Sequence, residues 1–169
     1  MRKMPLFLAI TSAALLSAGG AASLDRPAKV QNVVESRSND PSRYTYTRLY
    51  CTPDTETHFQ DVTVDLTKIE FAPPAPPIYI GGKLPASSAF FGGFDPHWGA
   101  HDLEARLNHP APAAQFVTFL AGVWSITTTD GETRRFRQGD VLRVEDTSPC
   151  KGHITVNTSD KPGFIIFAR

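Results

Sequence analysis

The sequence predicts an all-β domain, a sandwich or a barrel, and three observations indicate this class. Between residues 44 and 167 the chain divides into short stretches of aromatic, β-branched and alternating apolar and polar residues, the pattern of half-buried strands. Turn-forming residues separate these stretches at close, regular intervals. The chain has 14 Pro and 12 Gly, too many for a helical bundle, and no stretch after residue 22 keeps a long helical period.

The stretches predict ten short antiparallel strands. The second alternates strictly at Val62, Val64 and Leu66, and Asp130-Gly131 is the strongest hairpin signal in the chain. Phe71 to Pro77 contains four prolines, which cannot donate ladder hydrogen bonds, so an extended run along a sheet edge is expected there. Gly92 to His109 is the least regular part, a long loop. The expected strands cover residues 44–50, 62–66, 78–80, 89–91, 115–120, 124–129, 133–136, 141–144, 153–156 and 164–167.

Length and charge narrow the class of protein. The 169 residues have room for one domain. Seventeen Lys and Arg balance seventeen Asp and Glu, so no basic excess is available to neutralise a phosphate backbone, and no nucleic-acid partner is expected. The sequence also lacks the nucleophile-elbow, phosphate-loop, dinucleotide-binding and zinc-protease motifs.

The first 22 residues resemble a secretory signal peptide. A short basic start, Arg2 and Lys3, precedes an apolar run that ends in small residues up to Ala22. We expect residues 1–22 to be the signal, 23–43 a flexible or loosely docked arm, and 44–169 the folded domain. This predicts a secreted or periplasmic protein without stable membrane association after cleavage. An uncleaved anchor is the alternative, although Thr, Ser and Gly weaken the run as a membrane span.

Export changes how the two cysteines are interpreted. In an oxidising compartment, Cys51 and Cys150 are the only possible intramolecular pair. A disulfide between them, or two inert thiols, is favoured over a catalytic cysteine. A disulfide here would close a loop of about 100 residues and stabilise the fold by roughly 4–5 kcal/mol in the chain-entropy model.

Three segments together resemble the signature motifs of the cupins. Asn108 to Gly122 is similar to the first cupin motif, and Asp130 to Leu142 to the region between the motifs and the opening of the second. Gly152 to Asn157 resembles the close of the second motif, with His153 and Asn157 four residues apart. The resemblance covers Tyr44 to Phe167 and is firm only over His109 to Asn157. It implies a single-domain cupin-type antiparallel β-barrel or jelly roll, and a homodimer, since cupins commonly pair through their sheets.

The metal signature departs from the cupin pattern. A metal-binding cupin usually offers two His and a Glu from the first motif and one His from the second. His109 and His153 match two of these four positions, whereas Ala111 and Gln115 stand where a His and the Glu are expected. Two readings stay open: one divalent ion (Fe, Mn, Ni, Cu or Zn) held by His109, Gln115 and His153, or a metal-free pocket with these residues as hydrogen-bonding groups.

Neighbouring residues complete the candidate site. His97 and His101 lie four apart, so either is a candidate fourth ligand if Pro96 to Arg106 forms a helical turn; a solvated surface loop is the alternative. Phe90, Trp98 and Phe116 are candidate pocket walls.

Two functions follow from these expectations. In the first, an exported cupin acts on a small apolar or aromatic molecule, with His109, His153 and Gln115 as catalytic residues. With a metal it would be an oxidoreductase or a Lewis-acid isomerase, and without one an isomerase or dehydratase that works by proton transfer. In the second, the same pocket binds its ligand and performs no chemistry.

Overall fold

The computed structural model describes residues 30–32, 39–84, 86–100 and 108–169, and their fold is all-β, which confirms the predicted class. The described residues contain twelve strands and no helix, so no helix in this part of the chain is long and apolar enough to cross a membrane. The strands are β1 (Val30–Asn32), β2 (Arg43–Cys51), β3 (Thr57–Asp65), β4 (Thr67–Ile69), β5 (Ile78–Ile80), β6 (Ala89–Phe94), β7 (Gln115–Ala121), β8 (Trp124–Thr128), β9 (Thr133–Phe136), β10 (Val141–Val144), β11 (His153–Asn157) and β12 (Gly163–Ala168).

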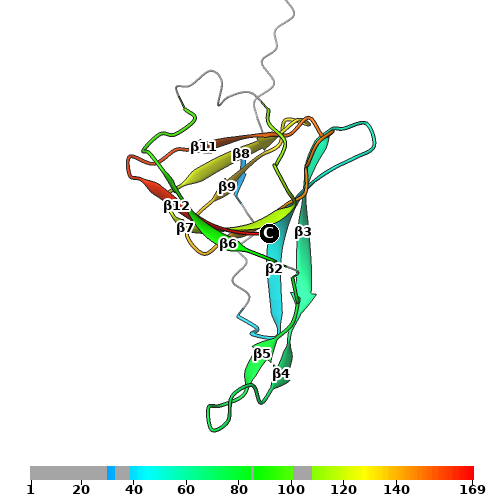
Figure 1. Ribbon diagram of the computed structural model, residues 1–169, viewed down its shortest axis with the longest axis vertical. Coiled ribbons are helices and arrows are strands. Elements are labelled where there is room, and N and C mark those ends of the chain that lie inside the picture. Colours follow the sequence, from blue (N-terminus) through cyan, green and yellow to red (C-terminus); the bar gives the residue numbers. More distant parts are fainter. Residues whose placement is uncertain (1–29, 33–38, 85, 101–107) are drawn as a thin grey trace, which may run out of the picture.

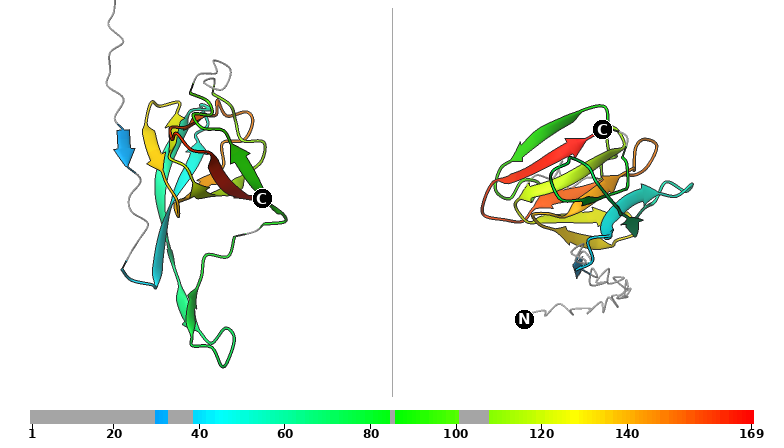
Figure 2. Two further views of the ribbon diagram at one scale, coloured as in Figure 1. Left: turned by 90° about the vertical axis from the view of Figure 1, so that its left-hand side faces the viewer. Right: turned by 90° about the horizontal axis from the view of Figure 1, so that it is seen from below.

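Two sheets face each other across the interior (Figure 1). The larger has six strands in the order β3-β2-β10-β7-β12-β6, and the smaller has four in the order β1-β9-β8-β11. Most neighbours pair antiparallel, as expected, but β1 pairs with β9 and β2 with β10 in parallel. Both parallel pairs join segments far apart in the sequence, which leaves room for the long connections that such pairs need. A two-stranded hairpin, β4–β5, projects beyond the sandwich (Figures 1 and 2).

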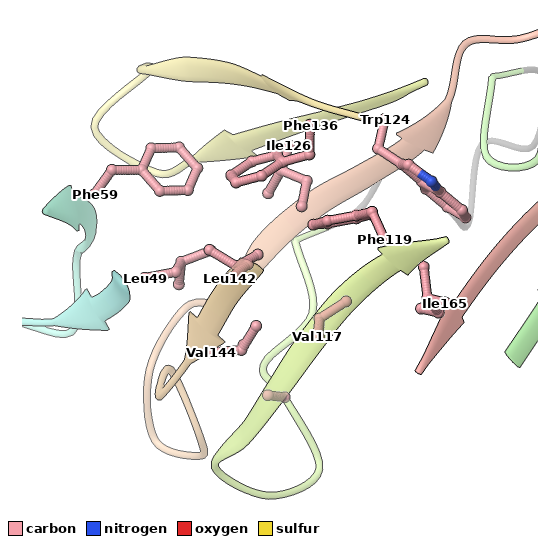
Figure 3. Packing of buried hydrophobic residues seen from close by; sticks show 11 residues of the cluster. Leu49, Phe59, Val117, Phe119, Trp124, Ile126, Phe136, Leu142, Val144 and Ile165 are labelled. Carbon is pink, nitrogen blue, oxygen red and sulfur yellow. The ribbon is translucent and has the colours of Figure 1, made fainter. Parts of the chain in front are cut away.

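The core lies between the sheets because inward-facing positions alternate along each strand. On β8, Trp124 and Ile126 are 1% and 3% exposed and face Phe119 of β7 and Leu142 of β10 (Figure 3). The rings of Phe119 and Phe136 stack with centroids 5.0 Å apart. These contacts join the central strands of both sheets into one packed layer.

The structure confirms the hairpin turn predicted at Asp130-Gly131 but not the extended segment predicted at Phe71 to Pro77. Asp130-Gly131 forms the turn of the β8–β9 hairpin, with Gly131 at φ 86° and its N–H donating to Thr128 O at 3.0 Å. The expected extended edge at Phe71 to Pro77 is wrong. The chain turns back there, with Ala75 N donating to Ala72 O, and so joins β4 to β5.

Three further expectations concern the ends and the long loop. The expected arm contains a short strand, β1, which pairs with β9 along Val30–Asn32. The first part of the expected loop after Gly92 belongs to β6. The expected signal peptide, residues 1–22, lies outside the described residues, as does His101.

Cys51 and Cys150 form a disulfide, as predicted. It links the end of β2 to the loop before β11, across 99 residues of sequence. Two residues further on, Gly152 leads into His153, the first residue of β11. The disulfide therefore ties the segment that carries His153 to the larger sheet.

Candidate functional site

A cavity of about 510 Å³ occupies the interior of the sandwich beside the core. Its volume is in the range of pockets that bind small organic molecules. Six aromatic side chains form much of its wall: Phe90, Phe94, Trp98, Phe119, Trp124 and Phe167. Most of the remaining wall is aliphatic, and the described polar lining residues are His109, Gln115, His153, Thr155 and Arg169. An apolar space with a few grouped polar side chains is the usual form of a ligand site.

His153 lines this cavity and is held from behind by Asp146. The His153 Nδ1 to Asp146 Oδ2 distance is 2.7 Å, and the side chains are 9% and 0% exposed. A carboxylate can only accept, so this contact requires a proton on Nδ1 and leaves the lone pair of the neutral ring on Nε2. Asp146 itself is absent from the cavity wall. The arrangement is a buried histidine–aspartate pair with the histidine facing an apolar space.

The second oxygen of Asp146 is unusual. Its Oδ1 is buried and has no hydrogen-bond partner among the described residues. Burying a polar atom without a partner costs free energy of folding. Buried polar atoms without a partner are rare in folded proteins, so this carboxylate is the polar feature behind His153 that the fold does not satisfy by itself.

The backbone positions His109 beside His153. His109 N donates to His153 O and His153 N donates to His109 O, each at 3.1 Å. The two imidazole centroids lie 4.9 Å apart. Ala111 N donates to Asp146 O at 3.1 Å, so the same segment also holds the loop that carries the carboxylate. The structure thus brings together the two histidines that the sequence singled out.

Gln115 and Phe116, both predicted to belong to the site, are neighbours on β7 and therefore face opposite sides of the sheet. Gln115, Val117 and Phe119 point inward and line the cavity, whereas Phe116 lies on the opposite face of the sheet. Phe116 there lines a second cavity, of about 530 Å³, with its ring against Tyr46. The period of two gives this result, because neighbouring strand residues face opposite sides. Gln115 and Phe116 do not line one pocket.

Of the other candidate residues, some line the cavity and others lie outside its wall. Phe90 and Trp98 line the cavity, as proposed for pocket walls. His97 lies outside its wall, and His97 Nε2 is 2.8 Å from Asp160 Oδ1 at the surface. Asp146 and Arg169, which sequence reasoning missed, belong to the site: Asp146 through His153, and Arg169 as a lining residue.

The donor groups fit a divalent cation poorly. No cluster of three or more His, Cys, Asp or Glu side chains suited to a metal occurs among the described residues. Gln115 is neutral, and the carboxylate nearest the histidines already accepts from His153 Nδ1. Two imidazoles and a neutral amide supply only two strong metal donors, fewer than the three protein ligands of a catalytic zinc site. The same residues suit proton transfer, for which an oriented imidazole with a free Nε2 is sufficient.

Comparisons with known proteins add no family to this description. No protein-family model matches the chain, and no curated protein matches it.

Proposed function

We propose that this protein is an exported cupin-type jelly roll that binds a small apolar or aromatic molecule and catalyses a proton-transfer reaction on it, an isomerisation or a dehydration. The stretch from His109 to Asn157, over which the resemblance to cupins is firm, contains β7 to β11, and these strands contribute His153, Gln115 and much of the wall of one cavity. The Cys51–Cys150 disulfide is consistent with an oxidising compartment outside the cytoplasm.

One observation carries the proposed chemistry. His153, in an apolar cavity, is oriented through Nδ1 by a carboxylate that is completely buried. A base held this way has one direction in which to act, toward the cavity, and low polarity strengthens its interactions with a bound molecule. Orientation of a base by a third group is the arrangement that activates imidazoles in many enzymes.

The residues support a short sequence of proton movements. His153 Nε2 removes a proton from the bound molecule, and Asp146 stabilises the imidazolium that forms. His153 then returns the proton to another atom, which isomerises the molecule, or the molecule expels hydroxide, which takes up the proton and leaves as water. In the dehydration His109, whose ring centroid lies 4.9 Å from that of His153, is suited to give this proton to the hydroxide in place of His153. His153 then keeps the proton that it removed, and solvent restores both rings before the next turnover. No step in this sequence passes through a metal.

A generic elimination tests the base without a known substrate. Nitrobenzisoxazole opens when a base removes its ring C–H proton. The N–O bond then breaks, and a coloured phenolate forms. We expect the purified mature protein to accelerate this reaction above free imidazole at the same concentration. His153→Gln should lower the rate by about a hundredfold, within the range for removal of a general base.

The chain contains a matched control for this substitution. His58 Nδ1 lies 2.7 Å from Asp130 Oδ2, the same pair geometry, but the two side chains are 30% and 29% exposed and lie outside the cavity wall. His58→Gln should leave the elimination rate unchanged. Equal rates in wild type and His153→Gln, with both proteins folded, would refute the base role and favour the alternative of a binding protein without chemistry.

Two other expectations from the resemblance stay predictions. A divalent metal at His109, Gln115 and His153 would be detected by elemental analysis of protein purified without chelator. The homodimer would be detected by sedimentation of the mature chain.

A further inference from the structure

We propose that the cavity selects molecules with an anionic group, and that Arg169 binds this group. The substrate class is then a small organic acid with an apolar or aromatic body. This inference deepens the proposed function and rests on it, because it concerns the same cavity.

Strand register places the polar lining residues at one end of the cavity. Val144, the last residue of β10, pairs with Gln115, the first residue of β7. Asp146, two residues later, lies behind His153. On the other side of β7, Ala168 of β12 pairs with Phe116, so Arg169 follows at the level of Gln115. Arg169, Gln115 and His153 therefore lie near the same end of the sandwich.

The opposite end of β7 is apolar and aromatic. Ala121 pairs with Phe164, and Trp124 Nε1 donates to Ala121 O at 3.0 Å, which leaves the indole without a donor for a ligand. Phe94 packs edge-on against both Trp124 and Trp98, with centroids 5.0 Å apart in each case. The cavity therefore has a polar end and an aromatic end, and suits a molecule with the same two parts.

The charge of the side chains that line the cavity indicates the charge of the polar group that a ligand would carry. The side chains of the described lining residues include no carboxylate, and the Arg169 guanidinium is the one lining group among them that is always charged. The Arg169 guanidinium lies over the Phe90 ring, 4.9 Å from its centroid. None of the ion pairs between described residues involves Arg169. A planar guanidinium stacked on an aromatic wall has its N–H groups available for a carboxylate.

The position of Arg169 also bears on the chemistry. His153 and Arg169 belong to the same end of the cavity, so a molecule held by its acid group presents nearby carbons to His153 Nε2. The proton that His153 removes is then from a carbon close to the acid group, and the apolar tail lies against Trp124 and Phe94.

Phenylbutyrate and phenylbutyramide test the inference as a matched pair of probes. They share one apolar body and differ in the charge of the head group. Both tryptophans of the chain, Trp98 and Trp124, line the cavity, so their fluorescence reports on its occupation. We expect the wild type to bind the acid roughly tenfold or more tightly than the amide, the usual size of a hydrogen bond to a charged group.

Substitutions at Arg169 should remove the preference for the acid. Arg169→Gln should bind acid and amide with equal affinity, because a neutral side chain does not distinguish the two head groups by charge, and Arg169→Lys should keep part of the preference. The side chain is exposed and the backbone of Arg169 still pairs with Ser88, so folding should be unaffected. Arg137→Gln, in the turn between β9 and β10 and outside the cavity wall, is the control.

The outcomes separate this inference from the proposed function. Two results overturn the inference: the wild type binds acid and amide equally, or Arg169→Gln keeps the preference for the acid. If His153-dependent elimination persists in either case, the proposed function stands. Failure of both probes to bind the wild type overturns the inference together with the proposed apolar ligand.

Discussion

Gly152 connects the fold to the site, and its replacement by alanine gives the sharpest structural prediction. A Cβ at Gly152 would lie 2.1 Å from His109 C and 2.3 Å from His109 O, so the backbone of His109 would have to move. That movement breaks the two backbone hydrogen bonds between His109 and His153, at about 1 kcal/mol each. Gly152 also has φ +86°, where a side chain costs about 1–2 kcal/mol. The expected total is about 3–4 kcal/mol.

Gly131 is the matched control, because it has the same φ of +86° and no atom within 4 Å of the added Cβ. Gly131→Ala should therefore cost about 1–2 kcal/mol, the strain alone. The free energy of unfolding is measured by equilibrium denaturation in urea, followed by the fluorescence of Trp98 and Trp124. Gly152→Ala should also slow nitrobenzisoxazole elimination, whereas Gly131→Ala should not. Equal losses of stability in the two variants would refute the claim that Gly152 is needed for the close approach of His109.

Two further predictions concern the framework. Replacing both Cys51 and Cys150 by serine should lower the free energy of unfolding by about 4–5 kcal/mol for a loop of this length, measured in urea; a change within error would mean that the disulfide adds nothing. Glu145 is the second case. Burial raises its pKa, but hydrogen bonds from Arg48 and Arg143 and their charges outweigh burial and hold the pKa below the ordinary value of 4.5. A carboxyl group whose pKa is lower in the folded than in the unfolded protein stabilises the folded state at any pH above its ordinary pKa. This stabilisation is lost as the pH falls through the pKa of the group in the folded protein. Glu145→Gln should thus be less stable than wild type at neutral pH, and the difference should shrink below pH 4.5; a difference that grows on acidification would contradict the ion pairs.

Local patterns were sufficient to predict most strands of the fold. The strands at β7 and β10 and the Asp130-Gly131 turn were predicted from neighbouring residues in the chain, and β9 and β10 begin and end where expected. The strands β1 and β4 were missed because three residues each carry too little pattern to be recognised, and β3 begins at Thr57, five residues before the expected start. The turn at Phe71 to Pro77 was missed because prolines allow either an extended edge or a turn.

The candidate site depended on contacts that a sequence does not display. His109 and His153 were found through motif resemblance, but Asp146 follows Glu145 in a polar stretch with no spacing that marks it. Only the fold brings its carboxylate behind His153. Phe116 could have been assigned to the outer face from the sequence, because it alternates with Gln115 and Val117. Arg169 carried no motif, and its position comes from the register of β12 against β7.

The measurement that most directly tests the central claim is the ¹⁵N spectrum of the His153 imidazole in the neutral state. The account predicts that the proton is on Nδ1, hydrogen-bonded to Asp146, and that Nε2 carries a lone pair facing the cavity. Asp146→Asn should abolish this tautomer preference. A neutral ring with its proton on Nε2 in the wild type would contradict the account, because His153 would then have no base to offer a bound molecule.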